Sequence, residues 1–427
     1  MAFHIVSRAS SALFSIRQDM DRPATGGAFS ARFAPVGWRH WSAAAFIFLF
    51  GCLLRFHVWH SFEYVGFDEK IYAMYVGDLD SAGLAGFPEI ARGYIEDVQK
   101  AAYVYLPPTR VAYLFPAYVL HELLHLPALV SLRVVSAFSS CLFMLVGYLF
   151  ALRWLNPRDA LATLALLACA PLQIHMAQYA FIDGVAALAA LLGVACFWES
   201  IRHGGKWLAA FAASFLFLLL AKQETGVFAG VFFCVVLCGA GRMGLGRAGW
   251  RHALALLASA LAAAGILSLL AGGPGTLREV FQVYARLSMT LPYTLATGGG
   301  PWYRYLVEHV FVAPAVFLPA AAFGICLAAR TPLNRYLLLF FVVTYAVMCA
   351  IPHGMNIRHT VMWDFPIALF AVQCVGWIVA GSRARGLVFF LAVAVMCLLS
   401  LRQYESIFVT LYDTDPTFMF RKVELIR

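Results

Sequence analysis

The sequence has few charged residues. Lys, Arg, Asp and Glu make up only 12% of its 427 residues, whereas hydrophobic residues make up 62%. A soluble domain is typically about one quarter charged and about half apolar. The mean hydropathy of +0.79 agrees with that contrast. The composition therefore excludes an ordinary soluble domain and predicts a protein whose helices are surrounded by lipid.

Cysteine is absent from the long loops of the sequence. All ten cysteines fall within apolar runs, where a thiol is most simply a small buried hydrophobic side chain. A disulfide framework would require cysteines in loop segments, and a zinc site would require them in close pairs outside the apolar runs. We therefore expect no disulfide framework and no cysteine-based metal centre.

The formal net charge of +9 could indicate binding to nucleic acid. Its distribution argues against that partner, because the arginines cluster in short loops between apolar runs. Such clustering is typical of the cytoplasmic loops of a membrane protein. We expect membrane lipids and no nucleic acid among the partners.

Apolar runs of about 17–25 residues, the length that spans a bilayer, recur along the chain. The fold class that we predict is an all-α polytopic transmembrane helical bundle of about 11–12 spans, with a long outer loop after the first span. The expected spans are 42–60, 132–152, 159–177, 183–199, 207–222, 225–240, 252–271, 305–328, 335–351, 360–380 and 386–402. The run 42–60 is read as a retained anchor.

These spans predict a cytoplasmic segment 1–41, a transmembrane domain 42–402 with the outer loop 61–110, and a short tail 403–427. The segment 111–127 breaks the alternation of spans. We expect it to form a re-entrant or partly inserted helix, since the Arg-rich loops then all remain inside. A full crossing with an irregular neighbouring span is the alternative.

The outer loop 61–110 concentrates acidic side chains, with eight of the chain's 22 acids. Asp68 and Glu69 open a segment of helical periodicity directly after the first span. A carboxylate fixed at the membrane surface can take a proton from an acceptor hydroxyl. The simpler interpretation of Asp68 is a solvated helix cap, since acids are common there.

Asp183 is the second acidic candidate. It lies between two apolar runs, where an ionisable side chain is costly and marks a functional site by default. A helix cap at the interface is the alternative.

Four basic side chains are expected near the same face: Arg133, Lys222, Arg358 and His359. Arginine suits phosphate oxygens as a two-pronged donor, and lysine serves as a point charge. Span ends also carry lysine and arginine simply because these side chains reach toward water. Convergence of the four on one face favours an anion site.

Two histidines, His121 and His125, lie four positions apart with Glu122 between them. The spacing is superficially that of a metal-binding helix. It lacks a third ligand and the usual placement of the glutamate. We expect packed or capping histidines and no metal site at this helix.

Five short motifs in order resemble those of the GT-C superfamily of membrane glycosyltransferases, in the branch that holds protein O-mannosyltransferases and the aminoarabinose transferase of lipid A. They cover about residues 42–240. They are Asp68-Glu69 with Tyr72, Leu106-Pro107-Pro108, Leu132–Ala137, Ala180–Asp183 and Lys222–Gly226. Asn356–His359 corresponds to a later basic segment. The chain departs from the family pattern at Leu106, where the family has His or Lys.

The resemblance implies transfer of a sugar from a polyprenyl-phosphate donor to a lipid, glycan or protein acceptor, usually with inversion. Asp68 would be the general base, with Glu69 and Asp183 as further catalytic acids. Arg133, Lys222, Arg358 and His359 would bind the donor phosphate. No metal is required in this scheme, although Asp68, Glu69 and Asp183 could ligate a divalent ion. The expected location is a bacterial inner membrane, with the active site on the outer face.

Other membrane functions fit part of the pattern. In a transporter or lipid flippase the same charges would line a pathway, and a membrane acyltransferase is a further alternative. Transporters often contain internal repeats with helices broken at matching positions, and no repeat is visible in this sequence. The long acidic outer loop and the ordered motifs favour the glycosyltransferase.

Overall fold

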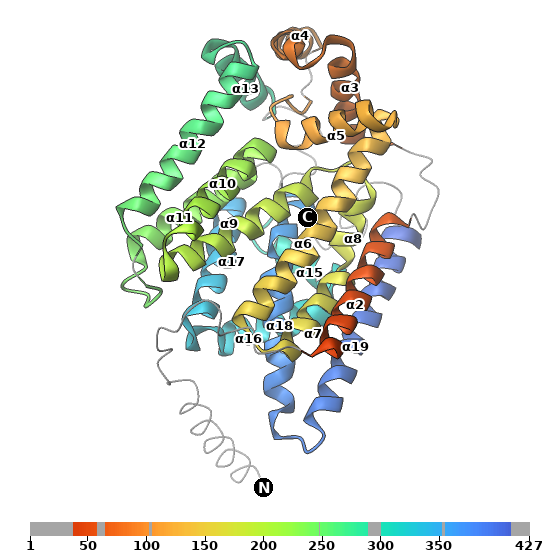
Figure 1. Ribbon diagram of the computed structural model, residues 1–427, viewed down its shortest axis with the longest axis vertical. Helices are drawn as coiled ribbons and strands as arrows, with labels where there is room; N and C mark the ends of the chain where they lie inside the picture. The colour runs from red at the N-terminus through yellow and green to blue at the C-terminus, as the bar shows by residue number, and fades with distance from the viewer. Residues whose placement is uncertain are drawn as a thin grey trace. The chain divides into compact units, whose positions relative to one another are not determined.

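The computed structural model describes residues 37–57, 65–101, 105–246, 248–288, 300–351 and 355–410. The chain divides into two units, 1–38 and 39–427, and the helical bundle belongs to the second. Its described residues are helical, without a strand (Figure 1). This confirms the predicted all-α polytopic bundle.

Figure 1 shows the helices of the described residues, coloured along the chain from α2 to α19. In order they are α2 (Trp38–Phe56), α3 (Phe67–Ala82), α4 (Phe87–Ala101), α5 (Val111–Leu124), α6 (Ala128–Trp154), α7 (Pro157–Ala168), α8 (Pro171–Gln178), α9 (Asp183–His203), α10 (Lys206–Ala221), α11 (Gln223–Gly239), α12 (Trp250–Leu270), α13 (Pro274–Ser288), α15 (Arg304–Val312), α16 (Pro314–Cys326), α17 (Pro332–Ala350), the 3₁₀ helix η4 (Ile357–Trp363), α18 (Asp364–Ile378) and α19 (Arg385–Tyr404).

Six helical segments of the described chain are long and apolar enough to cross a membrane, or seven if the bent pair α7 and α8 is one span. The expected spans 159–177 and 305–328 are not single helices. The first is bent by 50° between α7 and α8, and the second is divided into α15 and α16. Both breaks precede a proline, Pro171 and Pro314, which lacks the N–H that would continue the helix.

Helix α5 occupies the segment that disturbed the alternation of spans. It has 14 residues, which at about 1.5 Å per residue gives about 21 Å. The hydrocarbon core of a bilayer is about 30 Å thick. The helix is therefore too short to cross on its own, as a partly inserted segment would be.

The helices differ in how completely they are enclosed by protein. Helix α9 lies against α6 and α10, and 89% of its apolar window is buried. The corresponding share is 17% for α12 and 22% for α19. Helix α9 therefore forms the centre of the bundle, whereas α12 and α19 present most of their apolar side chains outward, as lipid-facing helices do.

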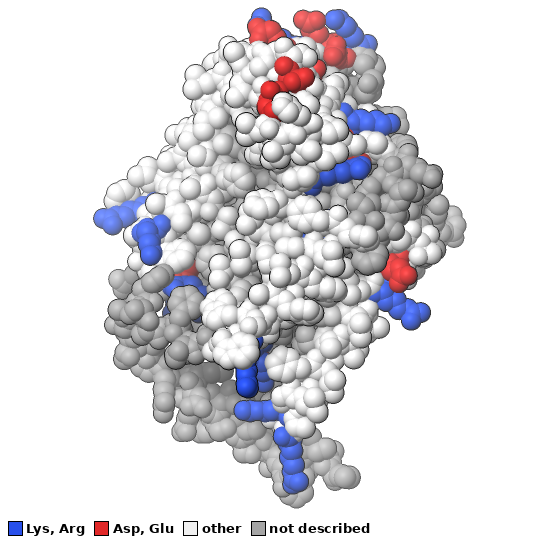
Figure 2. All heavy atoms as spheres, turned by 45° about the vertical axis from the view of Figure 1, so that its right-hand side comes forward, with Lys and Arg blue, Asp and Glu red and all other residues white. Residues whose placement is uncertain are grey.

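The acidic loop 61–110 is largely ordered as α3 and α4. Tyr72, Tyr75 and Tyr94 are buried, and the Tyr75 hydroxyl donates to the Leu106 carbonyl at 2.7 Å. Two acids of α4, Glu89 and Glu96, are exposed, and acidic side chains gather at that end in Figure 2. The loop thus forms a folded layer that packs on α5, α6 and α13.

Candidate active site

The first turn of α3 brings two adjacent carboxylates to the junction between the outer layer and the bundle. Asp68 and Glu69 follow Gly66, whose backbone N–H donates to Glu69 Oε2 at 3.0 Å. The two side chains then diverge to different partners. Glu69 is fully buried, and Asp68 retains 18% of its side-chain exposure.

Glu69 joins three segments of the fold. Its Oε1 atom accepts a hydrogen bond from the Ala180 backbone N–H at 2.8 Å and from Arg133 Nε at 3.1 Å. Both carboxylate oxygens of Glu69 are therefore engaged, and Arg133 already has an anionic partner. This geometry favours a positioning role for the pair, which fixes α3 against α6 and the turn before α9.

Ser136 belongs to the same motif as Arg133 and lies where α6 closely approaches the start of α9. One turn further along α6, its hydroxyl donates to the Phe181 carbonyl at 2.8 Å and lies 3.0 Å from the Tyr113 hydroxyl. A side chain added at Gly184 would lie only 3.3 Å from the Ser136 carbonyl oxygen. The small residues thus allow α6 and the start of α9 to approach closely, which sets the position of Asp183.

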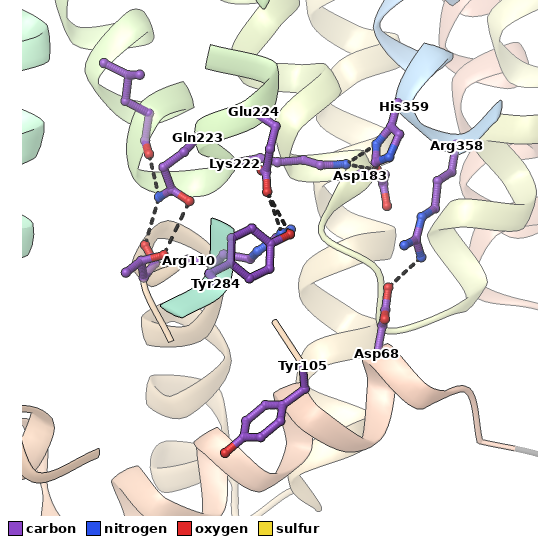
Figure 3. A network of polar contacts seen from close by, with 12 residues as sticks. Asp68, Tyr105, Arg110, Asp183, Lys222, Gln223, Glu224, Tyr284, Arg358 and His359 are labelled. Carbon is purple, nitrogen blue, oxygen red and sulfur yellow. Dashed lines mark hydrogen bonds and ion pairs between the residues drawn. The ribbon is translucent and has the colours of Figure 1, made fainter. Parts of the chain in front are cut away.

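Asp183 lies in a buried cluster with Lys222 and His359 (Figure 3). Lys222 Nζ is 2.5 Å from Asp183 Oδ1 and 2.6 Å from His359 Nδ1. Only 3% of each side chain of the Asp183–Lys222 pair is exposed. The cluster ties the start of α9 to the α10–α11 connection and to η4.

Arg358 connects this cluster to Asp68. Its Nη1 atom lies 2.6 Å from Asp68 Oδ2, and its guanidinium lies 5.3 Å from the centre of the Phe181 ring. Because Arg358 and His359 are neighbours in η4, Asp68 and Asp183 converge although they are 115 positions apart in the sequence (183 − 68). Figure 3 shows both pairs side by side.

A third pair at the site was not among the candidates from the sequence. Arg110 Nη2 lies 3.2 Å from Glu224 Oε1, and the Tyr284 hydroxyl donates to the same oxygen at 3.4 Å (Figure 3). Burial raises the pKa of Tyr284, and the negative charge of Glu224 raises it further. One signal was available, since Glu224 belongs to the same motif as Lys222.

Every cation expected at the phosphate site is thus close to an acid. Arg133 faces Glu69, Lys222 faces Asp183, and Arg358 faces Asp68. The Asp68–Arg358 pair has 18% and 22% of its side chains exposed. It is therefore more open to solvent and ligand than the Asp183–Lys222 pair.

The pairing of these carboxylates with cations also affects whether the site can bind a divalent metal ion. The three carboxylates that could ligate one, Asp68, Glu69 and Asp183, each already lie beside a cation, which opposes a second positive charge. Elsewhere in the described chain, ligand atoms of Asp80, His121 and Glu122 lie within 4.8 Å of one another. Helix α3 thus supplies Asp80 as a third candidate ligand beside His121 and Glu122 of α5. Both acids of this group, Asp80 and Glu122, are exposed.

No family model matches the sequence, and no curated protein matches it. Solved structures match the fold. ArnT from Cupriavidus metallidurans, bound to undecaprenyl phosphate, superposes with a TM-score of 0.55 at 16% identity, over 86% of this chain and 70% of that chain. The apo oligosaccharyltransferase of Archaeoglobus fulgidus gives a TM-score of 0.55 at 14% identity, over 86% and 55%.

A second structure of the archaeal enzyme, AglB with an inhibitory peptide and a dolichol-phosphate, gives a TM-score of 0.52 at 14% identity, over 91% of this chain and 56% of that chain. The chain thus spans about half the length of these oligosaccharyltransferases. Identities this low establish the fold alone. The chain therefore shares its transmembrane fold with ArnT and with the archaeal oligosaccharyltransferase, as the resemblance in its ordered motifs predicted.

Proposed function

We propose that the protein is a GT-C type glycosyltransferase. It moves a sugar from a polyprenyl-phosphate donor to a hydroxyl of a lipid, glycan or protein acceptor on the non-cytoplasmic face of the membrane. The fold supports this class, and one fold neighbour was solved with undecaprenyl phosphate. The observation that carries the proposal is the partly exposed Asp68–Arg358 pair beside the buried Asp183–Lys222 pair, which His359 joins through Lys222.

The reaction needs a base and a stabilised leaving group. Asp68 takes the proton of the acceptor hydroxyl while that oxygen attacks the anomeric carbon of the sugar. The bond from this carbon to the phosphate oxygen breaks, and polyprenyl phosphate leaves. Attack opposite the leaving group inverts the configuration. Arg358 neutralises the phosphate, because a guanidinium offers paired donors to its oxygens.

The ion pair between Asp68 and Arg358 couples binding of the donor phosphate to activation of the acceptor hydroxyl. Arg358 holds Asp68 in the ligand-free protein, so the carboxylate is neutralised by a hydrogen-bonded cation. A donor phosphate competes with Asp68 for the same guanidinium. When Arg358 turns toward the phosphate, the carboxylate is released to accept a proton. Donor binding therefore precedes activation of the acceptor.

The residues around the Asp68–Arg358 pair hold the backbone in place while Arg358 exchanges Asp68 for the phosphate. Lys222 and Asp183 hold His359, and His359 follows Arg358 directly in the chain. Asn356 steadies the same turn, since its side chain accepts a hydrogen bond from the Arg358 N–H at 3.1 Å. Glu69 and Arg133 fix the first turn of α3. These side chains thus restrict the backbone on both sides of the exchanging pair.

The test is transfer of labelled sugar from a panel of polyprenyl-phosphate sugars by purified protein in lipid, compared with Asp68→Asn. The amide keeps the size of the side chain and cannot take the proton. We expect turnover to fall by on the order of 10²–10⁴-fold. Binding of undecaprenyl phosphate should be retained or become tighter, because Arg358 is released.

Asp80→Asn is the matched control, since Asp80 is an exposed acid further along α3 and should keep the parent rate. Near-parental turnover in Asp68→Asn would refute the role of Asp68. Absence of any transfer, together with movement of the lipid or of a solute across the bilayer, would refute the glycosyltransferase and favour a transporter or flippase.

A further inference from the structure

Tyr72 is a buried tyrosine of α3 whose hydroxyl has no hydrogen-bond partner in the described chain. Its side chain is only 1% exposed. Nearby tyrosines are satisfied, since Tyr75 donates to the Leu106 carbonyl at 2.7 Å and Tyr113 lies 3.0 Å from the Ser136 hydroxyl. A buried polar group without a partner is unusual in a folded protein and requires an explanation.

Tyr72 lies on the face of α3 that carries Asp68. The two residues are four positions apart, so their side chains lie one above the other along the helix. The Tyr72 ring packs edge-on against Tyr113, with ring centres 5.2 Å apart. This contact packs the Tyr72 ring between α3 and α5.

Charged groups of the site act electrostatically on this hydroxyl. Burial raises the pKa of Tyr72, and the charges that act on it belong to Arg110, Asp68, Asp183 and Arg358. The phenol therefore stays protonated at neutral pH and can donate a hydrogen bond. Of these charges, Arg110 has the strongest effect.

Arg110 has an unused donor of its own. Its Nη2 atom pairs with Glu224 at 3.2 Å, whereas its Nε–H is buried without an acceptor in the described chain. The side chain is 4% exposed. Two buried donors, one of them on a cation, are thus left unmatched within the described chain, and the charge of Asp68 acts on both residues. An anionic oxygen is the ligand atom that would satisfy both.

We propose that the Tyr72 hydroxyl and Arg110 Nε form a donor pair for a phosphate oxygen of the polyprenyl-phosphate carrier. The inference rests on the proposed function for the identity of the ligand. A phosphate oxygen of the carrier accepts hydrogen bonds from these two donors, which have no acceptor within the described chain. Tyr72 and Arg110 thereby join Arg358 at the phosphate site.

The first test compares Tyr72→Phe with Tyr75→Phe. Removing an unmatched hydroxyl leaves no acceptor unpaired, so Tyr72→Phe should keep or raise the Tm of the ligand-free protein. Its affinity for undecaprenyl phosphate should fall by about 10-fold, as expected for loss of a hydrogen bond to a charged group. Tyr75→Phe loses a bond to a carbonyl, and should lower the Tm without changing affinity.

The second variant is Arg110→Lys, which keeps the charge beside Glu224 and removes the Nε–H. We expect a similar loss of affinity for undecaprenyl phosphate. Competition by inorganic phosphate separates the sources of the oxyanion. Weak competition by inorganic phosphate supports the lipid carrier, whereas equal affinity for inorganic phosphate would overturn the assignment to the carrier.

Parental affinity of Tyr72→Phe for undecaprenyl phosphate would overturn the proposal. Loss of affinity for the sugar-loaded donor alone would also overturn it, because the hydroxyl would then contact the sugar. If the parent binds undecaprenyl phosphate through Tyr72 but transfers no sugar, the inference survives and the proposed transferase fails. If the parent binds no polyprenyl phosphate, both fail.

Discussion

Two ion pairs that lie close together at the site differ in their surroundings. Asp183 and Lys222 are 2.5 Å apart with 3% of each side chain exposed, whereas Asp68 and Arg358 are 2.6 Å apart with 18% and 22% exposed. A buried charge that loses its partner is strongly destabilising, while a more exposed pair contributes little and can exchange. The buried pair therefore anchors the site, and the partly exposed Asp68–Arg358 pair is the part that a ligand can open.

Breaking the buried pair should have the largest effect. Lys222→Met leaves the Asp183 carboxylate uncompensated, and should lower the free energy of unfolding by about 3–5 kcal/mol. Thermal unfolding in detergent or lipid measures this, with the double variant Asp183→Asn/Lys222→Met expected to recover most of the loss. A Tm unchanged in Lys222→Met would contradict the role as an anchor.

Removing the arginine of the Asp68–Arg358 pair should weaken ligand binding more than it lowers stability. Arg358→Ala should change stability by less than about 1 kcal/mol, yet weaken binding of undecaprenyl phosphate by about 10–100-fold. Calorimetric titration beside thermal unfolding separates the two effects. The distinction between the pairs is lost if Arg358→Ala unfolds as readily as Lys222→Met.

Arg133 provides a second arginine to compare with Arg358, because the sequence suggested that it contacts the donor phosphate. In the structure it supports the buried Glu69. Arg133→Ala should therefore lower stability by about 1–3 kcal/mol through loss of a hydrogen bond to a buried group. Its effect on carrier affinity should be smaller than that of Arg358→Ala. The reverse order, with affinity lost and stability kept, would restore Arg133 to the phosphate site.

Removal of divalent metal should have the smallest effect. The site's cations already neutralise its carboxylates, and a carrier with a single phosphate needs less compensation than a pyrophosphate. Dialysis against a chelator should leave the rate of sugar transfer within about two-fold of the untreated enzyme, far below the roughly 10²-fold effects that catalytic groups exert. Activity lost in chelator and restored by Mg²⁺ or Mn²⁺ would instead place an ion at Asp68 or Asp183.

Local patterns singled out several of the residues that the structure brings together. Asp183 stood out because an ionisable residue between two apolar runs is costly. Asp68 stood out because it opens a helical segment directly after the first span, and Arg358 and His359 because they add positive charge near the same face. The pairing of these residues was not predictable. Residues 68, 183, 222 and 358 meet only because α3, α9, the α10–α11 connection and η4 pack at one level.

The sequence by itself determined the helical bundle, because apolar runs of spanning length have no other stable form in lipid. It also indicated the residues whose charge is costly there. The tertiary structure alone decided which cation faces which acid, that Glu69 is a buried anchor, and that Tyr72 and Arg110 carry donors unmatched within the described chain. The physical reason is distance: hydropathy is a property of each segment, whereas a hydrogen bond depends on two side chains that packing brings within about 3 Å.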